Sequence, residues 1–167
     1  GALLEQVGHT LALAVWGNHG PTIVHWQESP LSSPVNLRLG DVMPLLTSAT
    51  GRCFAAHLSD GPGLERTGPM IQDELRRLQA IAHAQSRADV PTTMAQVQAL
   101  FAEVRQRGMA RVVDTLLPGV VGFCAPVFDS DRRMVMGVVA LGSAATFDAD
   151  WGGAVEAPLR AAGGRAG

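Results

Sequence analysis

Hydrophobic residues recur along the chain with two different spacings, one typical of strands and the other of helices. Near the start, residues 9–16 and 22–28 are rich in β-branched and aromatic residues. Between them, residues 17–21 (GNHGP) have the composition of a turn. We expect an antiparallel hairpin in which His25 pairs near Leu13, so that His9, His19 and His25 do not form a three-histidine metal site.

The next segment combines loop signals with the beginning of a helix. Residues 29–34 are rich in Ser and Pro and predict a loop, and residues 35–39 predict a short strand. Thr47 or Ser48 is a suitable N-cap for a helix whose body is residues 53–58. Gly51, inside the first turn, allows another group to approach closely.

Two further helices are predicted in the middle of the chain. Residues 59–68 have a loop composition, and Pro69 at position N1 would begin a helix reaching about residue 88. The following helix has Thr93 as its cap and ends at Gly108. Its apolar side chains recur at helical spacing and are expected to face a sheet; they are Val97, Leu100, Phe101 and Val104.

After Gly108 the spacing becomes that of strands, in residues 109–114, 119–128 and 134–142, with a turn at 129–133. Pro126 requires an edge or bulged strand, unless its missing amide faces away from a neighbour. A last helix begins at Asp148 or Asp150. The fold class predicted is α+β, with about five or six mostly antiparallel strands and helices packed against them.

Composition limits the possible functions. The 167 residues are 47% hydrophobic, with 13 basic against 15 acidic side chains and a net charge of −2, as expected for one compact soluble domain. Every basic residue is Arg, which excludes chemistry that needs a lysine amine. The arginines are scattered, so we do not expect this chain alone to bind DNA.

The cellular location is predicted from features that the sequence lacks. Two cysteines, Cys53 and Cys124, are too few for a disulfide framework and, with no signal peptide, predict a cytoplasmic protein. No apolar run reaches the roughly 20 residues of a membrane span, so no membrane association is expected. The chain starts without Met, and we expect it to be a piece of a longer protein.

Enzyme motifs are lacking. The sequence contains no Gly-x-Ser-x-Gly elbow, no His-Glu-x-x-His and no Gly-x-Gly-x-x-Gly. We therefore predict a protein that is not an enzyme and that needs no cofactor or metal. The alternative is a redox sensor or enzyme that uses Cys53 or Cys124, although Cys124 is also interpreted as a small buried hydrophobic residue.

Five short motifs occur in the order and spacing of one protein family. They are residues 47–52 (TSATGR), 104–108 (VRQRG), 117–120 (LPGV), 125–129 (APVFD) and 138–142 (VVALG). In these motifs the sequence resembles the C-terminal effector-binding domain of IclR-type bacterial transcription regulators over nearly its whole length. The resemblance implies a single GAF-like domain at 1–167 and a winged helix-turn-helix domain that is not in this chain.

The resemblance also implies a function and a site. A small organic-acid effector would bind between the sheet and the 47–52 segment and modulate DNA binding by the missing domain, in a homodimer or tetramer. Backbone amides at the helix start would meet the carboxylate. The effector-binding residues implied are Ala49, Thr50, Gly51, Asp114, Gly122, Cys124, Val139 and Leu141.

Departures from the family pattern affect the expected ligand. The linker before Pro118 keeps only one carboxylate, Asp114, which is also interpreted as a solvated turn residue. The last strand has Val139 and Leu141 where relatives that bind small polar acids have hydroxyls. Because buried polar ligand groups need partners, these apolar walls favour a larger acid that is aromatic or partly apolar.

Overall fold

The structure is a computed structural model that describes residues 10–28, 38–58, 62–81, 89–113, 115 and 119–165. The elements in chain order are β1 (Thr10–Gly17), β2 (Gly20–Gln27), α2 (Ala49–Leu58), α3 (Pro62–Ala80), α4 (Met94–Arg107), β3 (Ala110–Val113), β4 (Val120–Phe128), β5 (Met134–Ser143), α5 (Glu156–Ala162) and β6 (Gly164–Arg165).

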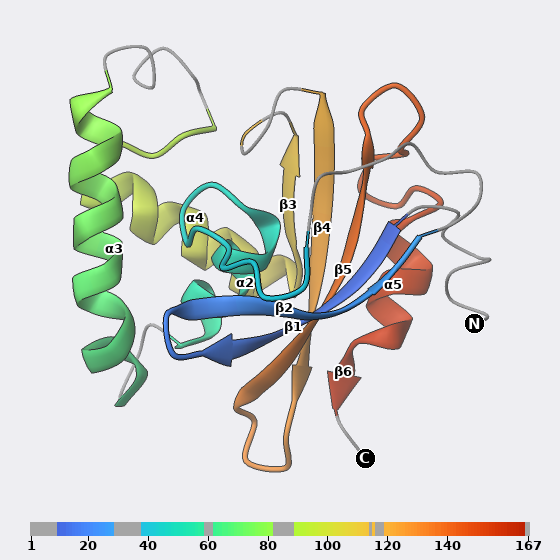
Figure 1. Cartoon of the computed structure of the whole chain (residues 1–167), viewed down its shortest axis with the longest axis horizontal. Coiled ribbons are helices and arrows are strands. Elements are labelled where there is room, and N and C mark those ends of the chain that lie inside the picture. Colours follow the sequence, from blue (N-terminus) through green and yellow to red (C-terminus); the bar gives the residue numbers. More distant parts are fainter. Residues whose placement is uncertain are drawn as a thin grey trace.

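One sheet organises the molecule. Its strands lie in the order β2, β1, β5, β4, β3, all neighbours antiparallel, and the short β6 pairs in parallel with β4. In Figure 1 the helices α2, α3 and α4 lie on one side of this sheet and α5 lies on the other. The predicted α+β class, with five or six mostly antiparallel strands, is confirmed.

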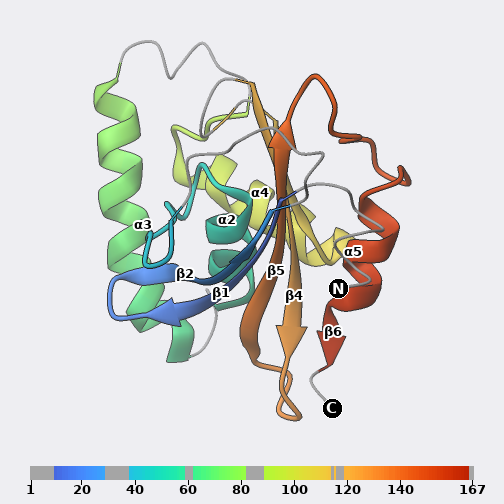
Figure 2. The same cartoon turned by 45° about the vertical axis from the view of Figure 1, so that its right-hand side comes forward.

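Each face of the sheet has its own core, because side chains alternate along a strand. The face under α2 contributes Ala12, Cys124 and Val139, and the face under α5 contributes Phe123 and Ala140. Helix α2 packs directly on β3, β4 and β5, and α4 packs on α2. The turned view in Figure 2 shows the same arrangement.

The orientation predicted for α4 is therefore wrong in one respect. Both of its ends are as expected, with the Thr93 hydroxyl accepting from the Gln96 amide and Gly108 at a left-handed φ of 76°. The helix, however, packs mainly on α2 and not directly on the sheet. Helix α2 already covers that face of the sheet, so α4 forms an outer layer.

The predicted hairpin is confirmed, with Leu13 opposite His25 as expected. Its turn is shorter than the predicted 17–21, since Gly17 and Gly20 are already paired. Residues 29–37 lie outside the described residues. They include the predicted Ser/Pro-rich loop and most of the predicted strand 35–39. Val42 forms an isolated bridge to Thr22 beside the hairpin.

The predicted start of α3 is wrong. Residues 59–68 were expected to form a loop before Pro69, but the helix begins at Pro62, which takes the N1 position itself, and Pro69 lies inside it. An internal proline removes one helical hydrogen bond. Burial of Thr67, Ile71 and Leu75 on one side of the helix offsets that loss. Residues 82–88 of the expected helix lie outside the described residues.

The last helix also begins later than predicted, at Glu156 instead of near Asp148 or Asp150. The Asp148 carboxylate does not cap this helix, because it accepts hydrogen bonds from the amides of Asp150 and Ala154. These bonds close a loop before α5, and they lower the pKa of Asp148.

Pro126 lies in a central strand, yet its missing amide costs no ladder bond to β3. Pairing between β3 and β4 ends at Ala110 and Cys124, two residues before Pro126. The Pro126 carbonyl oxygen lies near Gly163, after α5. The short β6 pairs with β4 from Val127 onward, and the pairing of β4 with β5 is irregular between Val127 and Phe128. Of the explanations given above, an irregular strand at this point is the one that the pairing supports.

Candidate functional site

Two rows of side chains cross the sheet beneath α2. The Gly122 row consists of Thr10, Leu141, Gly122 and Val112, and the Cys124 row consists of Ala12, Val139, Cys124 and Ala110. Register places the members of each row side by side on neighbouring strands. Four of the predicted site residues are thus brought together, namely Gly122, Cys124, Val139 and Leu141.

The first turn of α2 lies directly over the Gly122 row. A methyl group at Gly122 would be 3.0 Å from Leu141 Cδ2 and 3.6 Å from Ala49 Cβ, so the helix start and the sheet are in contact there. Ala49, Thr50 and Leu141 are all buried. The predicted site is closed in this structure, and Asp114, its remaining member, lies outside the described residues.

Ser48 explains why α2 begins where it does. The Gly51 amide donates to Ser48 Oγ at 2.8 Å, and that hydroxyl donates to the Pro44 carbonyl at 2.7 Å. A methyl group at Gly51 would lie 1.8 Å from the Pro44 oxygen, so only glycine fits. The Gly51 amide therefore already has an acceptor within the protein. Of the three backbone amides predicted to meet a ligand, those of Ala49 and Thr50 remain.

Those two amides are the open donors of this helix. The first amides of an α-helix have no partner inside the helix. No acceptor contacts the Ala49 or Thr50 amide among the described residues. Just before the helix, Glu74 of α3 accepts from the Leu45 and Leu46 amides at 2.8 and 3.1 Å. The segment leading into α2 is thus already adapted to a carboxylate.

Thr10 is a member of the Gly122 row that sequence reasoning missed. Its side chain shares the face of Ala12, since β1 pairs with β5 without interruption from Thr10 to Ala14. The residue is 0% exposed, and its hydroxyl has no hydrogen-bond partner among the described residues. Leaving a buried hydroxyl unpaired costs about 1–3 kcal/mol. The only sequence signal was a polar residue on the inward face of an apolar strand.

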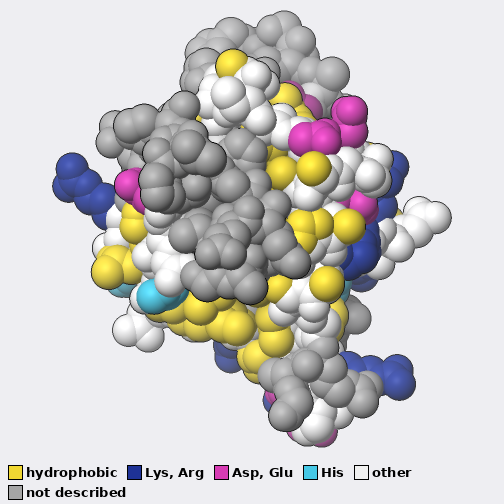
Figure 3. Space-filling view, turned by 90° about the vertical axis from the view of Figure 1, so that its right-hand side faces the viewer, with side chains coloured by type: hydrophobic (Ala, Val, Ile, Leu, Met, Phe, Trp, Pro, Cys, Tyr) yellow, Lys and Arg dark blue, Asp and Glu magenta, His cyan; other side chains and the backbone are white. Residues whose placement is uncertain are grey.

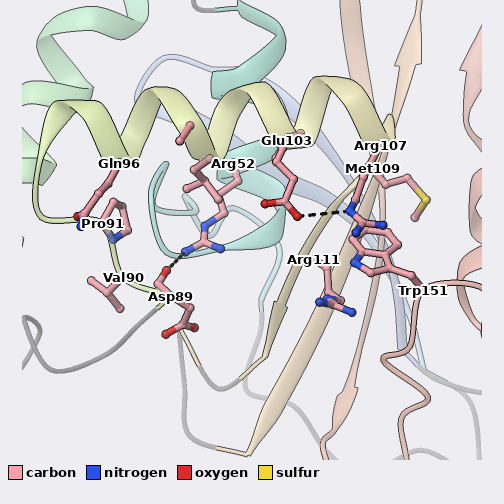
Figure 4. A pocket seen from close by; sticks show the side chains of 13 residues that line it. Arg52, Asp89, Val90, Pro91, Gln96, Glu103, Arg107, Met109, Arg111 and Trp151 are labelled. Atoms are coloured by element: carbon pink, nitrogen blue, oxygen red, sulfur yellow. Dashed lines mark hydrogen bonds and ion pairs between the residues drawn. The ribbon is translucent and has the colours of Figure 1, made fainter.

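A cavity of about 420 Å³ lies away from these rows, between α4, the segment 89–91 and the loop before α5. We call it the arginine cavity, because Arg52, Arg107 and Arg111 line it. Figure 4 shows their guanidinium groups together with Glu103 and Trp151. The other lining residues are Asp89, Val90, Pro91, Gln96, Ala99, Leu100, Val104 and Met109.

Hydrogen bonds position Arg52 at the wall of this cavity. Arg52 Nε donates to the Leu46 carbonyl and its Nη2 to the Asp89 carbonyl, at 2.8 and 2.6 Å. Burial lowers the pKa of Arg52 to about 10 although Asp89 and Glu103 raise it, so the group stays charged at neutral pH. Thr115 donates to the Asp89 carboxylate.

A second cavity, of about 450 Å³, lies between α3, the β1–β2 turn and the segment 42–47. Its walls include His19, Met43, Met70 and the carboxylates of Asp73 and Glu74. Burial raises the pKa of Glu74, and the amides of Leu45 and Leu46 lower it. The Glu74 carboxylate therefore connects this cavity with the segment that leads into α2.

Comparison with known proteins decides the family. A family model described as the C-terminal part of the bacterial transcriptional regulator IclR matches residues 1–165. The chain belongs to the IclR family. The five motifs quoted from the sequence are therefore those of an IclR C-terminal domain, a domain of transcription regulators that generally binds effectors.

Solved structures support the assignment. The chain is similar to HmgR of Pseudomonas aeruginosa, at 32% identity with a TM-score of 0.76 over 96% of this chain and 60% of that one. IclR of Thermotoga maritima is 21% identical, with a TM-score of 0.68 over 94% of this chain and 58% of that one. An IclR regulator of Alicyclobacillus acidocaldarius is also 21% identical, with a TM-score of 0.67 over 96% of this chain and 59% of that one. Comparison with curated proteins gives no match.

The predicted IclR resemblance and GAF-like α+β fold are confirmed by these matches. The chain spans about 60% of the length of the solved relatives, so the activity of a whole regulator exceeds what this domain contains. The relatives are transcription regulators and not enzymes. No helix in the described part of the chain is both long and apolar enough to cross a membrane.

The environment of the two cysteines in this IclR domain argues against the alternative of a redox-active thiol. Cys53 of α2 and Cys124 of β4 are both free and fully buried. Burial raises the pKa of Cys53, and its hydrogen bond with Cys124 raises it further, which disfavours the thiolate needed for redox chemistry. His57 Nδ1 lies 2.8 Å from the Cys53 carbonyl, to which it donates, so that nitrogen is not a base for the thiol. Among the described residues no group of three or more His, Cys, Asp or Glu could hold a metal ion.

Proposed function

We propose that this IclR domain senses a small organic acid, aromatic or partly apolar, that binds between the first turn of α2 and the Gly122 row. Binding would modulate DNA contacts made by a winged helix-turn-helix domain elsewhere in the regulator. Family membership supports an effector-binding role. The Thr10 hydroxyl supports this location, because it is a buried donor and acceptor without a partner among the residues that the structure describes.

The polar end of the ligand has complementary groups at this position. The amides of Ala49 and Thr50 point from a helix N-terminus, whose partial positive charge favours a carboxylate. Thr10, on the same row as Gly122, supplies a hydroxyl that can donate to a ligand oxygen. Asp114 belongs to the proposed site through the resemblance alone.

The apolar part of the ligand would contact the rows themselves. Val112 and Leu141 lie on either side of Gly122, whose missing side chain leaves the only small position in that row. Val139 and Cys124 extend the apolar wall toward the middle of α2. A short oxoacid would leave its polar atoms unmatched against these side chains.

Because the rows are closed, binding requires movement. The contact between Ala49 and the Gly122 row must open, either by a new Leu141 rotamer or by a shift of α2 away from the sheet. A ligand that binds only the open form shifts the population toward it. Helix α2 carries α4 on its outer side, so the same shift would move the outer helical layer.

A ligand screen tests the proposal. We expect benzoate and phenylacetate to raise the melting temperature in a saturable manner, since a ligand specific for the folded state stabilises it by mass action. Glyoxylate and pyruvate at equal concentration and ionic strength should give a smaller shift. A Ser48→Ala variant, whose cap of α2 is lost, should respond less. Flat responses to all four acids, or the larger shift with the oxoacids, would contradict the proposal.

We also propose that the domain pairs with copies of itself as a homodimer or tetramer. The face seen in Figure 3 supports this, since hydrophobic side chains form a band across its lower half while arginine side chains lie toward the edges of the view. Light scattering of the purified chain at micromolar concentration should give at least twice the mass of 17.5 kDa. A monomer at all concentrations would contradict pairing through this domain.

A further inference from the structure

We propose that the arginine cavity is a second ligand site, separate from the effector site, and that it takes a small anion carrying two or more negative charges, such as a phosphate or a dicarboxylate. At about 420 Å³ the cavity falls in the range of small-molecule sites. The proposal stands on three observations within the part of the chain that the structure describes: guanidinium nitrogens without hydrogen-bond partners, two arginines against one indole ring, and an indole NH without an acceptor.

The arginines keep donors that the protein does not use. Among the described residues the hydrogen bonds of these side chains engage Nε and Nη2 of Arg52, Nε of Arg107 and Nη1 of Arg111. The other guanidinium nitrogens remain for a ligand. Planar guanidinium groups bind carboxylate and phosphate oxygens in pairs, which makes arginine well suited to such anions.

Trp151 contacts two of these cations. The guanidinium carbon of Arg107 lies 4.4 Å from the centroid of the indole ring, and that of Arg111 lies 4.8 Å from it. Both cation–π contacts are favourable, but two like charges on one ring repel each other. A bound dianion would remove that repulsion, whereas a monoanion would compensate only one charge.

The cavity's own carboxylates, Asp89 and Glu103, compensate the charge of its three arginines only in part. Glu103 pairs with Arg107 Nε at 3.3 Å, but both side chains are about half exposed, so water screens the pair. Asp89 meets Arg52 through its carbonyl and directs its carboxylate to Thr115. Arg111 has no carboxylate partner among the described residues, and its hydrogen bond goes to the Ala149 carbonyl.

The indole ring of Trp151 lines the cavity and carries a donor that the described residues leave unpaired. Its Nε1 is buried and has no acceptor among the described residues. The ring is held by Phe123 as well as by the two arginines, with ring centroids 5.4 Å apart. Figure 4 shows Trp151 beside Arg107 and Arg111 at one end of the cavity, with Arg52 and Asp89 toward the other.

Calorimetric titration of the unsubstituted chain with inorganic phosphate and with succinate, at constant ionic strength, tests this site. We expect saturable binding of both dianions and weaker binding of acetate. Arg111→Gln should weaken succinate binding by roughly tenfold or more, the effect of losing one charged hydrogen-bonding group. Arg76→Gln, at an exposed arginine of α3 outside the cavity, is the matched control and should bind like the unsubstituted chain.

Two further readouts make the result decisive. Phosphate should change tryptophan emission in the unsubstituted chain but not in Trp151→Phe, which locates the anion. Thr10→Val should bind succinate normally, because Thr10 belongs to the proposed effector site and not to the arginine cavity. Succinate binding therefore tests the cavity even if the proposed effector site binds no ligand. Absence of saturable binding, an equal response to acetate, or Arg111→Gln binding as tightly as Arg76→Gln at the same cooperative melting would overturn the proposal.

Discussion

The Gly122 row and the arginine cavity represent opposite ways of preparing a ligand site within one small domain. The first is apolar and closed, with a hydroxyl and two amides that have no partner among the described residues. The second is hollow and charged. A ligand of the first site must displace protein contacts before it binds, whereas a ligand of the second enters existing space.

This difference determines what each site can signal. Opening the Gly122 row changes the packing of α2 on the sheet, so binding there is linked to a conformational change. The arginine cavity needs no such opening, and Arg52 connects it to the first turn of α2 through the Leu46 carbonyl. If the two proposed sites bind their ligands, the closed site would act as the switch and the open one would affect α2 locally.

The largest expected effect concerns the part that both sites share, the start of α2. Gly51→Ala would place a methyl group 1.8 Å from the Pro44 oxygen. We expect a loss of about 3 kcal/mol or more in the free energy of unfolding, at the upper end of overpacking effects. Urea denaturation measures it. Ala95→Gly, at an exposed position of α4, should cost only about 1 kcal/mol, and equal losses in both variants would show that the close approach is unimportant.

Leu141→Ala should affect ligand binding at the Gly122 row but not at the arginine cavity. Truncating this buried side chain should lower the free energy of unfolding by about 2–3 kcal/mol. It should also tighten binding of benzoate or phenylacetate, because the row no longer has to open, while succinate binding at the arginine cavity stays unchanged. Calorimetry with both ligands distinguishes these results. A weaker affinity for both aromatic acids would show that Leu141 is a contact and not a barrier.

A smaller effect is expected from the pH dependence of Glu74. Burial raises the pKa of this carboxyl group above its usual 4.5; Asp73 also raises it, while Arg77 and the Leu45 and Leu46 amides lower it. The folded state therefore binds the proton more tightly than the unfolded state. Its contribution to stability is present below pH 4.5 and is lost as the pH rises through the folded-state pKa.

Unfolding experiments at several pH values check this sign. The free energy of unfolding of Glu74→Gln, compared with that of the unsubstituted chain, should lack this component of the pH dependence. Glu65→Gln, at an exposed residue in the first turn of α3, is a matched control. If stability instead rose with pH in the range just above 4.5 only when Glu74 is present, the hydrogen bonds to Leu45 and Leu46 would outweigh burial.

Features set by local chemistry were predictable from the sequence. Thr93 and Gly108 mark the ends of α4 because a cap hydroxyl and a left-handed glycine act within a few residues. Alternation along β4 and β5 correctly placed Gly122 with Cys124 and Val139 with Leu141. The start of α3 was missed because Pro69 also fits an N1 position, and only tertiary packing decides between it and Pro62.

The remaining parts of the sites depend on contacts between distant segments. Thr10 is notable only because none of the described residues pairs with its hydroxyl, which is a property of the packed structure. The arginine cavity joins Arg52, Arg107, Arg111 and Trp151, which come from four separate elements or loops and form no motif. A cap at Thr47 or Ser48 was predictable, but the hydrogen bond from the Gly51 amide that selects Ser48 was not.

Thr10→Val provides the most direct test of the central claim, that an organic acid binds where this hydroxyl lies. The substitution replaces an unpaired buried hydroxyl by a methyl group of the same shape. We predict that the free energy of unfolding rises by about 1 kcal/mol while the affinity for the best aromatic acid of the screen falls by roughly tenfold, the effect of one lost hydrogen bond. Unchanged affinity in a stably folded Thr10→Val variant would contradict the account.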